Sequence, residues 1–256
     1  MSRAYYNEND RHAAEWLRSL IREGLISDGE VDERGIEDVR GEDLRGFTRV
    51  HLFAGIGGWD YALGLAGWPS DRPVWTGSCP CQPFSAAGKG LGEKDPRHLW
   101  PHMRRLVAEC RPPVVFGEQV ASRAGRGWLS GVRADLEALG YAIGASDLCA
   151  AGAGAPQIRQ RLYWMADATG VRSWPAQSGD GKAEAEGRRA HTSSSDRRFT
   201  DGFGNIYRIP ESDVPFVVNG FPGILDQIRA YGNAIVPQVA AEFIMAYMES
   251  VGMEAP

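Results

Sequence analysis

The sequence predicts an α/β protein in which helices cover both faces of a mostly parallel sheet. Short apolar and β-branched segments alternate along the chain with segments whose apolar residues recur every three to four positions. One strand-like segment, residues 47–53, runs directly into a glycine-rich turn and then a helical stretch, which forms a βα unit. Together these patterns favour parallel strands joined by helices.

The individual elements follow from the same patterns. Residues 10–23 predict a helix, because their apolar side chains form one stripe and Gly24 follows where a glycine commonly ends a helix. A strand over residues 47–53 and a helix starting at Trp59 come next. Further strands are expected at residues 74–76, 113–117, 142–148 and 161–165, and further helices at about residues 97–110, 129–139 and 231–247.

Composition restricts the class of protein. With 256 residues, 43% of them hydrophobic, and 8 Trp, the chain has enough apolar surface for a large core. No apolar run approaches the ~18–20 residues of a membrane span, and the N-terminus is too acidic and polar for a signal peptide. We therefore expect a cytoplasmic protein without membrane contact. Four cysteines without paired spacing predict neither a disulfide scaffold nor a metal site.

The net charge of −5 comes from one end of the chain. Residues 1–46 hold 7 Arg against 12 acidic residues, and the remainder holds 21 basic and 21 acidic residues. This distribution neither indicates nor excludes a nucleic-acid partner, because an acidic protein can still carry a basic cleft.

One stretch interrupts the α/β pattern. Residues 168–214 are rich in Gly, Ser, Ala and charge, which is typical of a loop or a mobile segment without a core of its own. We therefore expect residues 1–167 and 215–256 to form one domain, with residues 168–214 as a short separate region.

The glycine-rich turn, residues 53–58, is the first candidate binding feature. Its backbone lacks Cβ bulk, so a nucleotide-like ligand can approach it closely at the carboxyl end of a strand. A tight strand-to-helix turn without a ligand has the same sequence, so this feature alone leaves both interpretations open.

Cys81 is a candidate nucleophile. It lies in Pro-Cys-Gln-Pro, between a predicted strand and a Gly-rich polar stretch. A buried, inert thiol is the usual alternative, but two prolines and polar neighbours are poor material for a core strand.

Three charged residues follow at predicted strand ends. Glu118 lies at the end of an apolar strand, where it would point into a ligand crevice or into solvent. Arg159 and Arg161 share one face if the chain is extended, and they would contact a phosphate or base, or simply mark an exposed edge.

Five motifs follow one another in order: Phe-Ala-Gly-x-Gly-Gly, Pro-Cys-Gln-Pro-Phe-Ser, Glu-x-Val, Gln-x-Arg-x-Arg, and Tyr-Gly-Asn-Ala-Ile-Val-Pro-Gln at residues 231–238. This order resembles the C5-cytosine DNA methyltransferase family over about residues 47–167 and 215–245. The resemblance implies a Rossmann-like class I methyltransferase fold, S-adenosylmethionine as the cofactor and double-stranded DNA as the partner.

The layout departs from the family in one respect. Too few residues separate the glycine turn from Pro80 to hold the two strands that carry the family's cofactor-binding acids. Residues 4–10 resemble the family's second strand, with Glu8 as the ribose-binding acid, and residues 36–39 resemble the third strand, with Asp38 as the adenine-contacting acid. We therefore expect a rearranged chain in which these strands come first. In the alternative, residues 1–46 are an unrelated acidic extension.

The resemblance also implies roles for individual residues. His51 and Gln119 depart from the family pattern, which usually has Asp and Asn there. The implied catalytic residues are Cys81, Glu118, Arg159 and Arg161; the implied cofactor-binding residues are Glu8, Asp38, Phe53, Ala54, Gly55, Gly57, Gly58, Pro80 and Asn233; the implied DNA contacts are Gln82, Ser85, Arg97, Arg188 and Arg189.

The activity implied is methyl transfer to carbon 5 of a flipped-out cytosine through a covalent cysteine adduct. The short region 168–214 favours a target of about two to four base pairs. We expect a monomer, with a partner protein for target recognition left open, and the compact chain suggests a phage or mobile element. An inactive or partner-dependent DNA-binding relative, and a related reaction on RNA or with another electrophile, remain alternatives.

Overall fold

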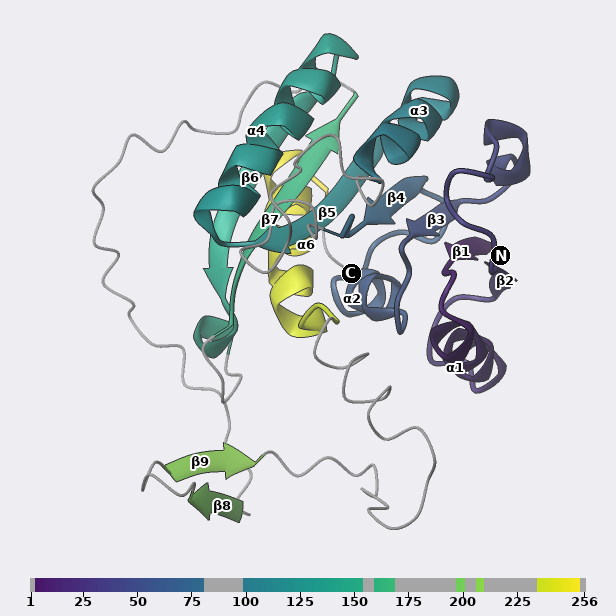
Figure 1. Cartoon of the computed structure of the whole chain (residues 1–256). Helices are drawn as coiled ribbons and strands as arrows, with labels where there is room; N and C mark the ends of the chain where they lie inside the picture. Colours follow the sequence, from purple (N-terminus) through teal and green to yellow (C-terminus); the bar gives the residue numbers. More distant parts are fainter. Residues whose placement is uncertain are drawn as a thin grey trace.

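The computed structural model describes residues 3–80, 99–153, 159–168, 197–200, 206–209 and 234–253. Its main feature is a seven-stranded sheet of order β2-β1-β3-β4-β5-β7-β6 (Figure 1). Strands β1 to β5 that neighbour one another are parallel, and β7 runs antiparallel to both β5 and β6. The strands are β1 (Ala4–Asn7), β2 (Gly29–Asp32), β3 (Arg49–Leu52), β4 (Val74–Gly77), β5 (Val114–Val120), β6 (Ala142–Cys149) and β7 (Gln160–Asp167).

Helices cover both faces of this sheet, so the predicted mostly parallel α/β class is confirmed. Helices α3 and α4 pack into one apolar cluster, while α2 and α6 pack into a second cluster on the opposite face (Figure 1). The helices are α1 (Arg11–Arg22), α2 (Gly58–Leu65), α3 (Trp100–Cys110), α4 (Arg123–Ala138) and α6 (Pro237–Ser250), with short 3₁₀ turns η1 (Gly41–Leu44) and η4 (Ala150–Ala153).

The central strand β5 shows why both faces need cover. Val115 packs with the α3 and α4 cluster, whereas Val114 and Phe116 pack with the α2 and α6 cluster, and all three are fully buried. Because successive side chains of a strand point to opposite faces, a run of consecutive apolar residues requires helices on both.

Helix α1 forms where the periodicity predicts it. The Asp10 side chain accepts a hydrogen bond from the Ala13 N–H at 2.9 Å, which caps the helix, and Gly24 after its end has φ +68°. Leu17 packs with Tyr6 of β1 and Ala54 beside the glycine turn. Tyr6 also stacks on His51, so α1 lies on the same face of the sheet as α2.

The N-terminal segment is part of the sheet. Strand β1 pairs in parallel with β3 from Ala4 opposite Arg49 to Asn7 opposite Leu52, and β2 pairs with the other edge of β1. The prediction that the first strands lie beside the glycine-turn strand is confirmed, so these strands are not an extension outside the sheet. That this order is a rearrangement of the family's chain stays an interpretation.

The connection from β3 through α2 to β4 has an unusual hand. The connections from β3 to β4 and from β4 to β5 both move in the same direction across the sheet. Their helices, α2 and α3, lie on opposite faces, so the two connections have opposite handedness. The connection from β1 through α1 to β2 moves in the opposite direction across the sheet, and α1 lies on the same face as α2. Because both direction and face are reversed relative to the α3 connection, the α1 and α3 connections have the same handedness. Because parallel crossovers are right-handed in about 98% of cases, the α2 connection is the left-handed one.

Three sequence predictions about elements are wrong. The strand expected at residues 36–39 lies instead at Gly29–Asp32, and residues 36–38 form a turn. The last helix starts at Pro237 rather than residue 231, since proline fits the first helical position and disfavours a helical conformation in the residue before it. In the region expected to be a loop, β8 (Arg197–Thr200) and β9 (Ile206–Ile209) form an antiparallel pair.

Among the described residues, none of the helices combines the length and apolar character needed to cross a bilayer. The same part of the chain contains no cluster of three or more His, Cys, Asp or Glu side chains arranged to hold a metal ion.

Candidate active site

The glycine turn contains backbone conformations that most residue types adopt only with strain. Gly55 has φ +56° and Gly57 has φ +82°, both in the left-handed region that favours glycine. Phe53 also has a positive φ, +54°, which is uncommon for a bulky residue and is held here by the surrounding contacts. The Gly57 N–H donates to the Ala54 carbonyl at 3.0 Å, which closes the turn before α2.

Glu8 lies directly against this turn. It follows the last residue of β1, and its Oε2 accepts a hydrogen bond from the Gly55 N–H at 2.7 Å. Its Oε1 accepts another from the Asp10 N–H at 2.9 Å. Burial raises the pKa of the Glu8 carboxyl, and these two N–H donors oppose the rise. The structure thus brings together the two segments predicted to hold the cofactor.

The end of β1 is also tied to the end of β2. Asn7 is buried, and its Nδ2 donates to the Arg34 carbonyl at 2.8 Å. The Arg34 guanidinium pairs with Asp32 at the end of β2 at 2.6 Å and with Asp43 at 2.9 Å. These contacts fix the segment that leads from β2 toward Asp38, which lies in the turn at residues 36–38 rather than on a strand.

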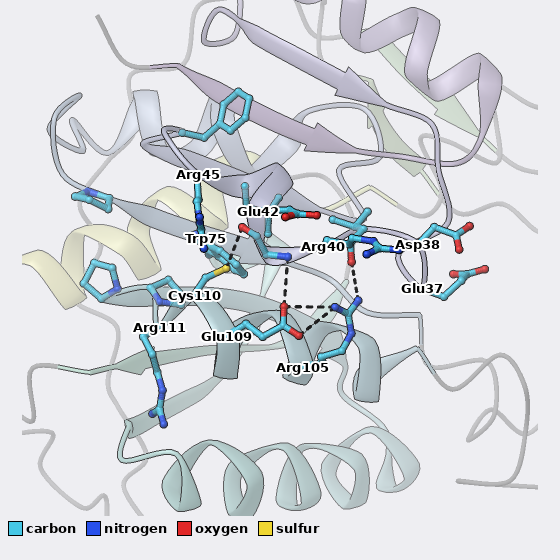
Figure 2. A pocket seen from close by; sticks show the side chains of 17 residues that line it. Glu37, Asp38, Arg40, Glu42, Arg45, Trp75, Arg105, Glu109, Cys110 and Arg111 are labelled. Carbon is cyan, nitrogen blue, oxygen red and sulfur yellow. Dashed lines mark hydrogen bonds and ion pairs between the residues drawn. The ribbon is translucent and has the colours of Figure 1, made fainter.

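Asp38 lines a pocket of about 990 Å³ between the 37–47 segment and α3. Figure 2 shows its charged lining, in which Glu109 accepts from the Gly41 N–H at 3.3 Å. Residues that precede β3, β4 and β5, namely Phe47, Pro73 and Pro113, also line it. The pocket therefore extends to the amino ends of the strands, away from the carboxyl ends where Glu8 and Glu118 lie.

Glu118 and Arg161 form the second half of the site. Strands β5 and β7 are antiparallel, and their register places Val120 opposite Arg161 and Glu118 opposite Tyr163. The Arg161 Nε lies 2.6 Å from the Glu118 Oε1, and Glu118 is 8% exposed. Burial raises the pKa of the Glu118 carboxyl, although the nearby charges of Arg161 and Arg159 oppose the rise.

Glu118 lies beyond the point where β5 stops pairing with β4. The last paired residues are Thr76 and Phe116, so Glu118 is level with the chain that leaves β4 toward Pro80. Its neighbour Gln119, which is buried, donates from Nε2 to the Cys79 carbonyl at 3.3 Å. This bond ties the Glu118 strand to the segment that continues into Cys81.

Two further contacts join the surrounding segments to the site. The Trp59 indole N–H of α2 donates to the Ser78 Oγ at 2.9 Å, next to Cys79. The Arg159 guanidinium donates to the Ala234 carbonyl at 2.7 Å, so the predicted arginine motif contacts the chain directly after Asn233. Pro80 is exposed.

Several predicted residues lie outside the described part of the chain. They are Cys81, Gln82, Ser85, Arg97, Arg188, Arg189 and Asn233. Of the predicted set, the structure brings Glu8 to Gly55 and Glu118 to Arg161. Ala54 and Gly58 lie in or beside the turn; the Ala54 N–H donates to the Asn7 carbonyl at 2.9 Å, and a Cβ on Gly58 would lie 2.9 Å from the Ile235 side chain.

A buried ionic cluster behind the glycine turn escaped the sequence analysis. Asp60 of α2 pairs with Arg49 at 2.9 Å and with His51 at 3.1 Å, and all three are buried. A signal was present, because a basic residue and a histidine occupy alternate positions in an otherwise apolar strand. Only the tertiary structure shows which carboxylate they meet.

The comparison with protein families agrees with this arrangement. The family described as C-5 cytosine-specific DNA methylase matches residues 69–173, which include Glu118, Arg159 and Arg161. Over these residues the chain is similar to this family. The resemblance stated from the motifs is thereby confirmed.

Individual relatives of the family match part of the chain. Type II methyltransferase M.HhaI of Haemophilus parahaemolyticus is 29% identical over 167 residues, covering 50% of this chain and 51% of the relative. Type II methyltransferase M.NgoMIV of Neisseria gonorrhoeae is 32% identical over 172 residues, covering 50% and 55%. The chain thus spans about half the length of these relatives. A solved structure of a Spodoptera frugiperda DNMT2 mutant is also similar, with a TM-score of 0.42, 15% identity, and coverage of 71% of this chain and 54% of that one.

Proposed function

We propose that this protein transfers a methyl group from S-adenosylmethionine to carbon 5 of cytosine in double-stranded DNA. The observation that carries the proposal is the buried Glu118 carboxylate, 2.6 Å from Arg161, on a strand that Gln119 joins to the carbonyl two residues before Cys81. The Glu118–Arg161 pair, proposed to recognise the base, thus lies at the end of β5, next to the end of β4, from which the chain continues toward the candidate nucleophile Cys81. The match of residues 69–173 to the C-5 cytosine-specific DNA methylase family supports the same reaction.

The residues beside the glycine turn fit the proposed cofactor. Glu8 is a partly buried carboxylate at the carboxyl end of a strand, where it is suited to accept hydrogen bonds from a ribose diol. At Gly55, which has φ +56°, no atom lies within 4 Å of the place a Cβ would take, so the backbone there is open to close approach. Phe53, Ala54, Gly58, Pro80 and Asn233 complete the proposed set. Asp38 belongs to the set by the resemblance alone, because in the structure it lines the pocket that extends to the amino ends of the strands. When bound, S-adenosylmethionine supplies an electrophilic methyl group on a sulfonium.

Cys81 acts as the nucleophile in this proposal. Carbon 5 of cytosine is a poor nucleophile, so the Cys81 thiolate first forms a bond to carbon 6, and the ring electrons shift to make carbon 5 nucleophilic. A cofactor held beside the glycine turn would supply the methyl group to carbon 5, with the S–CH3 bond breaking and its electron pair staying on the sulfur of S-adenosylhomocysteine. The proton on carbon 5 leaves to a base or to water, and Cys81 leaves carbon 6, which restores the aromatic ring and the free thiol.

Glu118 stabilises the ring during the addition step. Negative charge develops at ring N3 as the thiolate adds, and a protonated Glu118 donates a hydrogen bond there while its other oxygen accepts from the exocyclic amine. The raised pKa of this carboxyl favours the protonated form that the step needs. Arg161 orients Glu118 and contacts the base O2, and Arg159 connects this edge to the chain after Asn233.

The substrate has to leave the duplex to reach this site. A cytosine stacked in DNA cannot contact a thiol at a strand end, so the base is flipped out at a cost of a few kcal/mol. Gln82, Ser85 and Arg97 on one side, and Arg188 and Arg189 within residues 168–214 on the other, are the proposed DNA contacts. The protein acts as a monomer in this proposal, and a partner protein for target recognition remains open.

The test is transfer of labelled methyl groups from S-adenosylmethionine to duplex DNA, followed by mass spectrometry of the nucleosides. We expect 5-methylcytosine with the wild type and none with Cys81→Ala. A duplex with 5-fluorocytosine at the target adds a second readout, because carbon 5 then carries no proton to lose and the Cys81 adduct persists. Cofactor binding without transfer to DNA would indicate an inactive or partner-dependent relative, and transfer to RNA alone would indicate the other alternative.

A further inference from the structure

The ionic cluster behind the glycine turn is built around one carboxylate. The side chain of Asp60 is 2% exposed, and its Oδ1 contacts the Arg49 guanidinium at 2.9 Å and the His51 Nε2 at 3.1 Å. Its Oδ2 accepts the Ser27 N–H at 2.6 Å. A buried carboxylate is retained only when charged partners and hydrogen bonds compensate for the lost water, and this one has both.

The partners of Asp60 make further contacts of their own. Arg49 also donates to the Ser27 Oγ at 3.0 Å and to the Trp68 carbonyl at 3.3 Å. The His51 Nδ1 contacts the Thr76 Oγ1 of β4 at 2.8 Å. Burial alone would raise the pKa of the Asp60 carboxyl, but the hydrogen bonds and charges of His51, Ser27 and Arg49 hold it well below its usual range. The carboxylate is therefore ionised throughout the neutral pH range.

The cluster brackets the glycine turn. Arg49 and His51 belong to β3, which ends at Leu52, and Asp60 lies in the first turn of α2, which begins at Gly58. The chain between them holds the three residues with positive φ, at 53, 55 and 57. The ion pair therefore joins the entry of the turn to its exit and fixes the distance between them.

The same cluster reaches the N-terminal strands. Ser27 lies between α1 and β2, and Tyr6 of β1 stacks on the His51 ring with 5.0 Å between ring centroids. Glu8 is two residues beyond Tyr6 and accepts the Gly55 N–H. Asp60 thus holds together the two parts of the chain that supply the carboxylate and the backbone of the cofactor cleft.

We propose that Asp60 is a positioning residue for the cofactor: it fixes β3, α2 and the Ser27 loop relative to one another, so that the Gly55 backbone and the Glu8 carboxylate are held in one arrangement. This inference rests on the proposed use of S-adenosylmethionine. Asp60 does not touch the cofactor in this proposal, so it acts on affinity rather than on the chemical step. The left-handed connection places α2 on the face of the sheet where Ser27 and Tyr6 lie. The Asp60 carboxylate can therefore contact both the N-terminal segment and the strand that leads into the glycine turn.

The experiment compares Asp60→Asn with the wild type and with Val132→Ala. Asparagine keeps the shape and removes the charge. Val132 is a buried residue of α4 on the opposite face, so its truncation destabilises the protein without touching the cluster and serves as a matched control for lost stability. Asp60→Glu, which keeps the carboxylate, replaces Asp60→Asn if that variant does not fold. Calorimetric titration with S-adenosylmethionine, steady-state methyl transfer and hydrogen exchange of residues 52–58 are the readouts.

We expect Asp60→Asn to raise the dissociation constant and the KM for S-adenosylmethionine about 10- to 100-fold, the range seen when a group that orients a binding residue is removed. The kcat at saturating cofactor should change less than about threefold, and exchange at residues 52–58 should accelerate relative to Val132→Ala. Equal cofactor affinity in Asp60→Asn and Val132→Ala, or a fall in kcat with an unchanged KM, would overturn the inference. A wild type that binds no S-adenosylmethionine would instead refute the proposed function.

Discussion

Replacing Glu8 by Gln tests the cofactor cleft most directly. In the structure both carboxylate oxygens accept backbone hydrogen bonds, from the Gly55 N–H at 2.7 Å and from the Asp10 N–H at 2.9 Å. Glutamine has one acceptor oxygen, so its NH₂ group must face one of these donors. The variant therefore loses one charge-assisted bond and places two donors against each other.

The size of the effect follows from these contacts. A hydrogen bond to a charged group contributes about 1.5–3 kcal/mol to stability, and the loss of one lowers the melting temperature by about 3–12 °C in a chain of this size. The lost charge also weakens the hydrogen bonds proposed from Glu8 to the ribose hydroxyls. At 1.4 kcal/mol per factor of ten, an equal loss there raises the dissociation constant for S-adenosylmethionine about 10- to 100-fold.

The measurement is isothermal titration of S-adenosylmethionine into wild type, Glu8→Gln and Glu30→Gln, each checked first by thermal unfolding. Glu30 is the matched control, since it is an exposed glutamate on the edge strand β2 and its ion pair with Arg3 is exposed as well. Because burial raises the Glu8 pKa, cofactor affinity of the wild type should fall toward acidic pH before that of Glu8→Gln does. Unchanged affinity in a folded Glu8→Gln variant would refute the assignment of Glu8 to the cofactor.

Three further outcomes are expected. Glu118→Gln should lower kcat for methyl transfer about 100- to 1,000-fold with cofactor affinity retained, because the proton donated to ring N3 is lost; equal kcat in single-turnover assays would contradict this. Gly57→Ala should lower the melting temperature by about 2–8 °C, since φ is +82° and the new Cβ would meet Leu17 and Ile26 at 3.3 Å; an unchanged melting curve would contradict this reasoning. The lowered pKa of Asp60 predicts that its contribution to stability is complete above the usual Asp pKa of ~3.9 and is lost as the pH falls below it. The free energy of unfolding measured with urea should therefore fall more steeply toward acidic pH in the wild type than in Asp60→Asn. Parallel pH dependences of this free energy in the two proteins would contradict the prediction.

The α/β class, the glycine turn and most element positions could be predicted from the amino-acid sequence. An apolar residue at every second position, or at every third to fourth position, is a local property of one segment, so it can be recognised without knowing which elements pack against that segment. The order of five motifs also predicted the similarity to the family that matches residues 69–173, and it picked out Glu118, Arg159 and Arg161 as site residues. The strand at residues 29–32 was missed because Gly-Glu-Val-Asp has little β-propensity, and its pairing with β1 is what makes it a strand.

The contacts between segments that are distant in the sequence depend on the tertiary structure. Antiparallel pairing of β5 with β7 sets Arg161 against Glu118 across forty residues of chain, and a one-residue change of register would have turned them to opposite faces. The face on which α2 lies, and with it the left-handed connection, depends on packing against α6 and not on the sequence of α2 alone. The cluster around Asp60 exists for the same reason: a buried charge is tolerated only where several distant segments bring it partners, and those distances are absent from the sequence.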